Sequence, residues 1–255
     1  MERIVSKSNP LIKDVKKLLL SSKERAKSGL FVLEGARLCF DAAESECEIE
    51  TVLITETAQN RYPEKAKALC GRARRSVIIS DEVSERLSDT EQPQGIFCVC
   101  KKKDGGSVRG RAVIALDKVQ DPSNIGAIIR SAEAFGIDTL ITYSCCDIYN
   151  PKALRASMGG ALRMNIVDTD DLEGMLGSLC ADYRIFATVP DRSAKSIKTA
   201  DFTKPSVCII GNEANGVEEN ILGASDELIT IPMSGRAESL NAAAACAVTM
   251  WEMLR

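Results

Sequence analysis

The sequence contains no histidine and few aromatic residues, and both absences narrow the chemistry open to it. Among 255 residues none is histidine, and only 4% are Phe, Trp or Tyr. Without histidine a Ser-His-Asp relay cannot form, and because there is no C-x-x-C pair either, we expect no zinc or other metal site. Since aromatic rings are scarce, base stacking is not expected to dominate any nucleic-acid contact.

Long apolar runs are also missing. No run approaches the roughly 20 residues that a membrane-spanning helix needs, and the N-terminal stretch MERIVSKSNPLIKDV lacks the apolar core of a signal peptide. We therefore expect a cytoplasmic protein that makes no membrane contact. The ten cysteines lie in apolar segments without a disulfide-like spacing, so we expect mostly buried, reduced thiols.

Basic charge is concentrated near the N-terminus. Residues 1–110 hold 20 Lys and Arg against 17 Asp and Glu, although the whole chain has a net charge of −3. Within the first 30 residues eight are basic and three acidic. This patch is either a solvated helix face or a nucleic-acid contact. For a nucleic-acid contact, the candidate side chains are Lys7, Asn9, Lys13, Lys23, Arg25, Lys27, Arg37 and, further along the chain, Arg155.

Residues 101–110, KKKDGGSVRG, divide the chain, because charge, paired glycines and the lack of periodicity indicate an exposed connection. We expect a first domain at 1–103, a linker at 104–110 and a second domain at 111–255. In the first domain an amphipathic helix is followed by a basic turn, and then strands alternate with helices. The expected strands are LFVLEG, ETVLIT, SVIISD and GIFCVCKK, and the expected helices include residues 63–71 and 81–88. This pattern predicts a small α/β domain.

The second domain alternates more plainly. Its expected strands are AVIALDKV, TLITYS, RIFATV, VCIIGN and ELITIPM, and its expected helices lie at 124–135, 151–159, 171–181, 216–222 and 239–254. Strands that are so uniformly apolar predict a mostly parallel sheet with both faces covered. In such α/β folds, ligands bind at the carboxyl ends of the strands.

The common nucleotide-binding and hydrolase motifs are absent: there is no G-x-G-x-x-G after the first strand, no phosphate-binding G-x-x-x-x-G-K-[ST] and no G-x-S-x-G. Three strand-to-loop junctions stand out instead, each rich in small and polar residues. They are DPSNIGAIIRSAEAFG, IIGNEANGVEENI and IPMSGRAESLNAAAACAV. In the second junction, glycines permit close backbone approach to a ligand, although a plain capped turn explains them equally well. In the third, Ser239 is expected to cap an alanine-rich helix.

These three segments, in this order, resemble the three motifs of the SpoU/TrmH family of RNA 2'-O-ribose methyltransferases, a branch of the SPOUT superfamily. The motifs are N-x-G-x-x-x-R, G-N-E-x-x-G, and I-P-M followed by S-L-N. The segment YNPKALRASMGGAL is similar to another family helix, and SKSNPLIKDVKKL with KSGLFVLEGARL resembles the ribosomal-protein-like domain by which many members bind their substrate. The resemblance therefore extends over nearly the whole chain.

The resemblance implies an S-adenosylmethionine-dependent enzyme with a trefoil knot in its C-terminal domain, acting as a homodimer on RNA. It implies that Gly211, Ile231 and Leu240 bind the cofactor through their backbone, and that Thr188, Val189 and Met233 line its pocket. Strand ends with small or apolar side chains suit this role, because they leave amides and carbonyls available.

The resemblance also marks Arg130 as catalytic. A guanidinium with a pKa above about 12 is a costly base at neutral pH, so we expect Arg130 to bind RNA phosphate and position the ribose hydroxyl. The residues expected to orient Arg130 and the ribose are Asn124, Glu213, Ser239 and Asn241. An ion pair of Arg130 with Glu213 or Glu133 is the structural alternative.

The expected substrate is ribosomal RNA rather than tRNA, because of the N-terminal domain, and within ribosomal RNA we expect 23S rather than 16S. A tRNA 2'-O-methyltransferase is an alternative, as is a non-catalytic RNA-binding or ribosome-assembly factor with the same fold. The intact set of polar motif residues argues against a non-catalytic factor. The absence of phosphate-binding motifs argues against a metabolic enzyme that uses another nucleotide.

Overall fold

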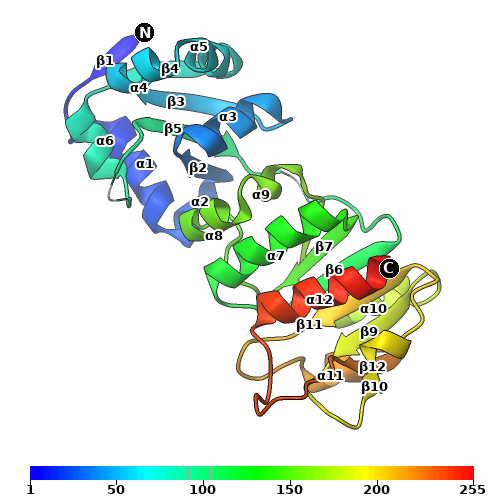
Figure 1. Cartoon of the computed structure of the whole chain (residues 1–255). Helices are drawn as coiled ribbons and strands as arrows, with labels where there is room; N and C mark the ends of the chain where they lie inside the picture. Colours follow the sequence, from blue (N-terminus) through cyan, green and yellow to red (C-terminus); the bar gives the residue numbers. More distant parts are fainter. Residues whose placement is uncertain (91, 104) are drawn as a thin grey trace. The chain divides into compact units, whose positions relative to one another are not determined.

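The computed structural model describes residues 1–90, 92–103 and 105–255, which form two compact units. The first unit comprises Met1–Asp104 together with Tyr149–Leu162, and the second comprises Gly105–Ile148 and Arg163–Arg255. Asp104, in the expected linker, lies outside the described residues. The chain thus returns to the first unit for one short segment after it has entered the second (Figure 1).

The first unit is built on a five-stranded mixed sheet in the order β1-β4-β3-β5-β2. Strands β1, β4 and β3 are parallel to one another, whereas β5 runs antiparallel to both of its neighbours, β3 and β2. The five strands are β1 (Glu2–Ile4), β2 (Leu30–Glu34), β3 (Ile49–Thr55), β4 (Arg75–Ile79) and β5 (Ile96–Lys101).

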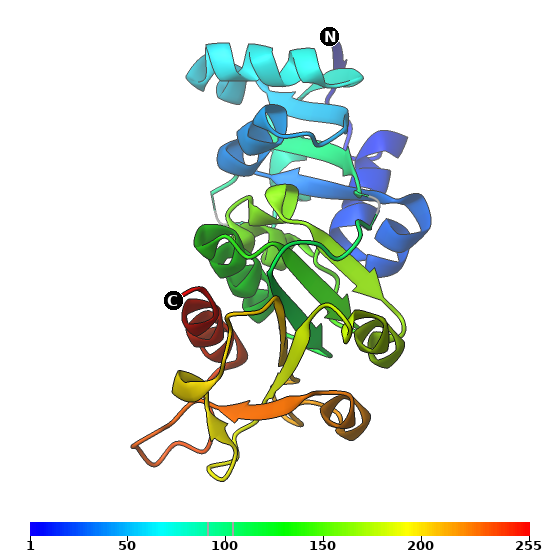
Figure 2. The same ribbon diagram turned by 90° about the vertical axis from the view of Figure 1, so that its right-hand side faces the viewer.

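Helices cover both faces of this sheet. On one face α1 packs beside α6, and its apolar residues Ile12, Val15 and Leu18 join a core with Val32 and Phe97 of the sheet. On the other face α3 packs beside α5 (Figure 2). The helices of this unit are α1 (Pro10–Leu20), α2 (Ser22–Ser28), α3 (Ala36–Glu44), α4 (Glu56–Arg61), α5 (Pro63–Arg72), α6 (Asp81–Leu87), α8 (Pro151–Ser157) and α9 (Gly160–Arg163).

The second unit contains a seven-stranded sheet in the order β10-β12-β9-β11-β6-β7-β8, and all its pairings are parallel. This confirms the expected α/β class with a large parallel sheet. The strands are β6 (Ala112–Asp117), β7 (Thr139–Tyr143), β8 (Ile166–Thr169), β9 (Arg184–Thr188), β10 (Lys195–Ser196), β11 (Ser206–Ile210) and β12 (Glu227–Thr230).

Two helix layers bury this sheet. Helices α7 and α12 lie side by side on one face, and α10 and α11 cover the other (Figures 1 and 2). Strand β6, in the interior of the sheet, is therefore buried along its whole length, as its continuous apolar sequence predicts. The helices are α7 (Pro122–Phe135), α10 (Leu172–Leu179), α11 (Glu219–Gly223) and α12 (Ala242–Leu254), with a 3₁₀ turn η1 (Ile197–Thr199).

Local sequence signals set the ends of α7. The carboxylate of Asp121 accepts a hydrogen bond from the backbone N–H of Ser123 at 2.7 Å, and Pro122 occupies the first helical position. The helix ends at Gly136, whose φ of 79° is the left-handed conformation that glycine adopts without strain. These caps place Asn124 in the first turn of α7 and Arg130 further along it.

The structure differs from the sequence-based prediction in several elements. The expected basic turn is helix α2, which Ser21 caps by accepting a bond from the backbone N–H of Glu24. The expected cap of the last helix was also wrong: Asn241, not Ser239, accepts bonds from the first turn of α12. Strands β1, β8 and β10 were not predicted, because two to four residues are too few to show an apolar alternation.

Six of the ten cysteines are buried, which matches the expected apolar surroundings. Across the described residues none forms a disulfide, and no group of three or more potential metal ligands occurs. No helix in the described part of the chain is long and apolar enough to cross a membrane.

Candidate active site

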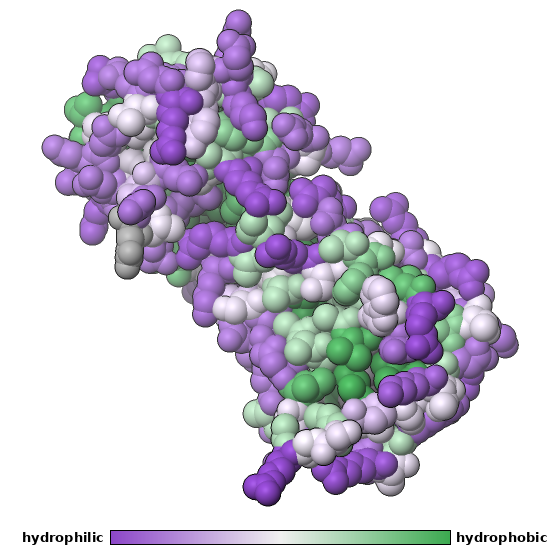
Figure 3. Space-filling view, viewed as in Figure 1, coloured by the Kyte–Doolittle hydropathy of each residue, from purple (hydrophilic) through white to green (hydrophobic). Residues whose placement is uncertain are grey.

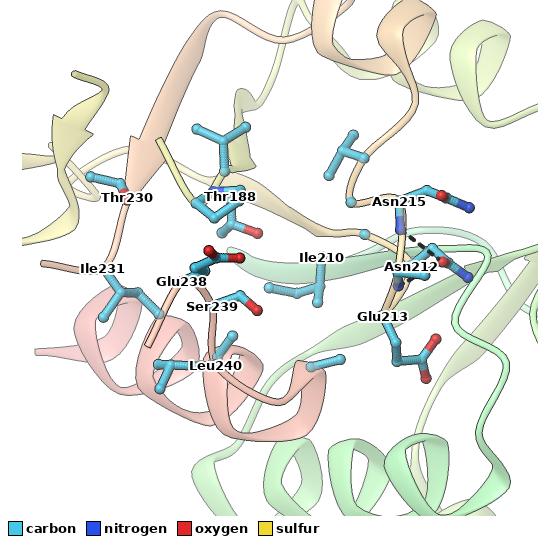
Figure 4. Close-up of a pocket in the computed structure, with 18 of the residues that line it drawn as sticks. Thr188, Ile210, Asn212, Glu213, Asn215, Thr230, Ile231, Glu238, Ser239 and Leu240 are labelled. Carbon is cyan, nitrogen blue, oxygen red and sulfur yellow. Dashed lines mark hydrogen bonds between the residues drawn. The ribbon is translucent and has the colours of Figure 1, made fainter. Parts of the chain in front are cut away.

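A cavity of about 440 Å³ opens at the carboxyl ends of β9, β11 and β12 in the second unit. Thr188, Ile210 and Thr230, the last residues of these three strands, contribute to its wall (Figure 4). The loop after β12 and the start of α12 close another side. This is the edge of a parallel sheet at which α/β folds bind ligands.

The turn after β11 forms a compact wall of this cavity. Asn212 and Gly216 exchange two backbone hydrogen bonds, at 2.9 and 3.0 Å, and the side-chain oxygen of Asn212 accepts bonds from the backbone N–H groups of Ala214 and Asn215. A Cβ on Gly211 would lie 2.1 Å from the backbone carbon of Gly216. The G-N-E-x-N-G motif therefore closes on itself tightly only because residue 211 has no side chain.

All six residues predicted to bind the cofactor line this cavity. They are Thr188, Val189, Gly211, Ile231, Met233 and Leu240. The Thr188 hydroxyl donates to the carbonyl of Ile209 at 2.8 Å. Because this bond occupies its proton, Thr188 presents its methyl group and lone pairs rather than a free donor.

Three of the five predicted catalytic residues form one hydrogen-bonded chain beside the cavity. The Asn124 amide nitrogen donates to Glu213 at 2.9 Å, and the Asn241 amide nitrogen donates to the Asn124 oxygen at 3.0 Å. Glu213 also accepts the backbone N–H groups of Gln120 and Asp121, at 3.2 and 3.1 Å. The three sequence motifs, more than 100 residues apart at their extremes, thus meet in one network.

The Glu213 carboxylate is held in its charged form. Partial burial acts to raise its pKa, but hydrogen bonds from Asn124 and from the backbone of Asp121 and Gln120 outweigh it, and the net pKa lies below the ordinary value. Glu213 is therefore an acceptor that fixes the amide of Asn124, not a proton donor at neutral pH.

Arg130 and Ser239 lie outside this network. Ser239 lines the cavity, and Arg130 is exposed on α7. Neither ion pair of the structural alternative forms: Glu133 binds Arg163 at 2.8 Å, and Glu213 accepts the bonds described above. Within the described ranges no hydrogen bond or ion pair engages the Arg130 guanidinium, so it is available to a ligand.

Most of the predicted RNA contacts are exposed in the first unit. Lys7, Lys13, Lys23, Lys27 and Arg37 are exposed there. Asn9 caps α1, since its side chain accepts the backbone N–H of Leu11. Arg155 is half-buried and lies 3.7 Å from the Glu34 carboxylate and 3.5 Å from that of Asp89.

Arg25 requires a correction. It is 2% exposed, and its guanidinium donates to the carbonyls of Leu18 and Leu19 at 2.6 and 3.3 Å. These carbonyls belong to the last turn of α1, which has no intrahelical donors for them. Arg25 therefore ties α2 to the end of α1 and is not open to RNA. Only the contact of the two helices, which sequence periodicity does not reveal, distinguishes it from its lysine neighbours.

Twelve of the twenty residues that line the cavity were not among the predicted site residues, and they include Pro190, Thr230 and Glu238. Glu238 directly precedes the S-L-N motif, and this adjacency is the one signal that would have indicated it. A buried carboxyl, Asp117, was also missed, because it sits at the end of an otherwise apolar strand.

Two family models match the chain. The SpoU rRNA methylase family model matches residues 111–251, and the model of an MRM3-like substrate-binding domain matches residues 9–98. The chain is 29% identical over 255 residues to "23S rRNA (guanosine(2553)-2'-O)-methyltransferase RlmP" of Bacillus subtilis, with 99% of each protein covered.

Two solved structures are similar over almost their full length. An AdoMet-bound rRNA methyltransferase from Sinorhizobium meliloti matches with a TM-score of 0.88 and 26% identity, covering 99% of this chain and 97% of that one. The SpoU methyltransferase AviRb from Streptomyces viridochromogenes, in complex with AdoMet, matches with a TM-score of 0.86 and 27% identity, covering 96% and 97%.

Proposed function

Because this chain belongs to the SpoU rRNA methylase family, as its motifs predicted, we propose that it transfers a methyl group from S-adenosylmethionine to a ribose 2'-hydroxyl of ribosomal RNA, most specifically of 23S rRNA. One observation carries this proposal. The six residues expected to hold the cofactor line a single cavity, and the Glu213–Asn124–Asn241 chain lies directly beside it.

The cavity fits the cofactor in size and chemistry. A volume of about 440 Å³ lies within the range of small-molecule sites, about 300–1,000 Å³. Backbone groups of Gly211, Ile231 and Leu240 would bind the cofactor, and Thr188, Val189 and Met233 would line its pocket. Bound there, S-adenosylmethionine supplies an activated methyl group on a positively charged sulfur.

The polar residues beside the cavity position the acceptor. Asn241 and Ser239 would hold the ribose, and Asn124, oriented by Glu213, would keep Asn241 in place. Arg130 would bind the neighbouring phosphate and hold the hydroxyl in line with the methyl group. We keep Arg130 in a positioning and charge-stabilising role, because its guanidinium does not readily lose a proton.

The first unit would recognise the RNA. Its match to a substrate-binding domain and its exposed Lys13, Lys23, Lys27 and Arg37 support this role. Charge of this kind binds the phosphate backbone without reading base identity. We propose that the first unit supplies affinity, and that fit to the cavity in the second unit selects the nucleotide.

We further propose a homodimer with a knotted second unit, acting in the cytoplasm. Helix α12 has exposed Ala244, Val248, Trp251 and Leu254 along one stripe, and Phe135 of α7 meets Trp251 with ring centroids 6.0 Å apart. Figure 3 shows apolar side chains gathered on this face of the second unit. An exposed apolar stripe of this kind marks a protein–protein contact.

The first test is transfer of labelled methyl from S-adenosylmethionine to RNA from a strain that lacks the gene. A 2'-O-methylated linkage resists alkaline hydrolysis, so the product can be mapped directly. We expect one new resistant position in 23S rRNA, with naked RNA or with isolated ribosomal subunits. Transfer to tRNA alone would replace the substrate class, and no transfer to any RNA or subunit would favour a non-catalytic assembly factor.

A further inference from the structure

The cavity in the second unit has an unbalanced charge. Among the described residues that line it, two carry carboxylates, Glu213 and Glu238, and none is Lys or Arg. A ligand that enters this cavity therefore meets negative but no positive side-chain charge. A cationic ligand is favoured there and a polyphosphate is disfavoured.

The two carboxylates are not equivalent. Glu213 accepts three hydrogen bonds and, in Figure 4, points towards α7 rather than into the cavity. Glu238 makes no hydrogen bond or ion pair with any other described residue. In Figure 4 its carboxylate points into the space between Thr188, Ile210 and Ile231. Glu238 is therefore the carboxylate with charge to offer a ligand.

We propose that Glu238 makes the cavity prefer the cationic cofactor to the spent product, S-adenosylhomocysteine. This inference rests on the proposed function. Methyl transfer breaks the sulfur–methyl bond and forms a bond from the methyl carbon to the ribose 2'-oxygen, whose proton is released to water. The electrons of the broken bond stay on sulfur, so the sulfonium becomes a neutral thioether while the rest of the cofactor is unchanged. A carboxylate near the sulfur loses its counter-charge at that moment, which weakens product binding relative to the cofactor.

Glu238 lines the same cavity as Ser239, one of the residues expected to hold the ribose. It directly precedes Ser239 and lies three residues before Asn241, whose amide joins the Asn124–Glu213 chain. Because the methyl group must reach the ribose beside these residues, the sulfonium that carries it would come close to the Glu238 carboxylate, which points into the cavity in Figure 4.

The test compares three ligands that differ in charge at one position. S-adenosylmethionine carries a sulfonium there, sinefungin an ammonium-bearing carbon, and S-adenosylhomocysteine a neutral sulfur. Dissociation constants are measured by calorimetry for the wild type, for Glu238→Gln and for the control Glu85→Gln, which removes the same charge from an exposed site on α6. Unfolding curves without ligand check that both variants are folded.

We expect Glu238→Gln to raise the dissociation constants of S-adenosylmethionine and sinefungin by about three- to tenfold, an effect typical of an exposed charge pair. The dissociation constant of S-adenosylhomocysteine should change by less than about twofold. The difference should shrink as salt is raised, and Glu85→Gln should bind all three ligands like the wild type. Equal weakening of all three ligands, or of none, would overturn the inference. Failure of the wild type to bind any of them would instead overturn the proposed function.

A kinetic readout gives an independent check. Steady-state kinetics give the ratio of the inhibition constant of S-adenosylhomocysteine to the KM of S-adenosylmethionine. This ratio should fall in Glu238→Gln by the same factor as the ratio of the dissociation constants of the same two ligands. A change in kcat with an unaltered ratio would assign Glu238 to acceptor positioning and contradict selection between cofactor and product.

Discussion

At the scale of single residues, the site separates groups that are held in place from groups that are left available. Glu213 and Asn124 use their polar atoms on each other and on the turn before α7. Arg130 on the same helix is exposed, with no partner among the described side chains. A fixed hydrogen-bonded network, together with an available cation on the same helix as Asn124, suits the recognition of an anionic, hydroxyl-bearing substrate.

Arg130→Ala should lower methyl transfer at least about a hundredfold, because the acceptor loses its alignment. The Kd for S-adenosylmethionine should stay within about threefold of the wild-type value. The free energy of unfolding should change by less than about 0.5 kcal/mol, since Arg130 is exposed and makes no ion pair with any described residue. Single-turnover transfer and calorimetry measure the two effects. Arg130→Lys, which keeps the charge but loses the planar fork, should recover part of the rate. Collapse of cofactor binding in Arg130→Ala would place this residue in the cofactor pocket.

At the scale of elements, Asp117 connects the end of β6 to the turn before α11. Its side chain is completely buried, and one carboxyl oxygen accepts the backbone N–H of Glu218 at 2.8 Å while the other has no hydrogen-bond partner among the described residues. Burial raises the pKa of Asp117, although the bond from Glu218 acts in the opposite direction. Because Val217 lines the cavity, this carboxyl positions part of the cavity wall.

The variant Asp117→Asn tests the link between Asp117 and the turn before α11, through the pH dependence of the free energy of unfolding. A carboxyl whose pKa is raised on folding stabilises the protein below its unfolded pKa, and this contribution is lost as the pH rises through the folded pKa. The asparagine variant keeps an acceptor for Glu218 and has no charge to bury. Its free energy of unfolding in urea, relative to the wild type, should therefore rise as the pH is raised above about 4, the ordinary pKa of an aspartate.

Asp117→Ala is the matched comparison. It leaves the Glu218 N–H without its acceptor and should be less stable than Asp117→Asn by about 1–3 kcal/mol at every pH. If Asp117→Asn lost as much stability as Asp117→Ala at neutral pH, the fold would depend on the charged carboxylate of Asp117. The proposed role of Asp117 would then be wrong.

At the scale of the whole molecule, two surfaces are open to partners. One is the basic surface of the first unit, and the other is the apolar face of α12, where Trp251 is 59% and Leu254 45% exposed. Each surface lies within one unit, so each can be altered without changing the core of the other.

A triple variant should bind RNA more weakly; it combines Lys13→Gln, Lys23→Gln and Lys27→Gln. Its Kd for RNA should also depend less on salt, because the slope of log Kd against log salt concentration falls by about 0.7–0.9 for each phosphate that is no longer neutralised. The Kd for S-adenosylmethionine should not change. Lys65→Gln with Lys67→Gln, on α5 of the same unit, controls for loss of charge alone. An equal effect of both sets would mean that net charge, and not this surface, attracts the RNA. Binding titrations at several salt concentrations decide between them.

Trp251→Glu should convert a dimer to a monomer, because it places a charge in an apolar contact without disturbing a buried side chain. Sedimentation velocity at micromolar concentration measures the change, and Glu252→Gln on the same helix is the control. A wild-type protein that sediments as a monomer would contradict the proposed dimer.

Much of this architecture was predictable because its causes are local. Apolar runs of about five residues, helix caps such as Asp121 and the glycines at 136 and 216 act over a few residues, so the sequence alone determined most strands and helices and the class of the second sheet. The three motifs determined the family, since they preserve the residue types that the chemistry requires.

Only the tertiary structure decided which side chains meet. Asn241, Asn124 and Glu213 are joined because the parallel order of β11 and β6 brings their loops to one edge of the sheet. Arg25 is buried while neighbouring lysines are exposed, because α2 folds back on α1. The charge of the cavity and the packing of Tyr149–Leu162 with the first unit likewise depend on contacts between distant residues. No local pattern encodes such contacts, since they arise only when the whole chain has folded.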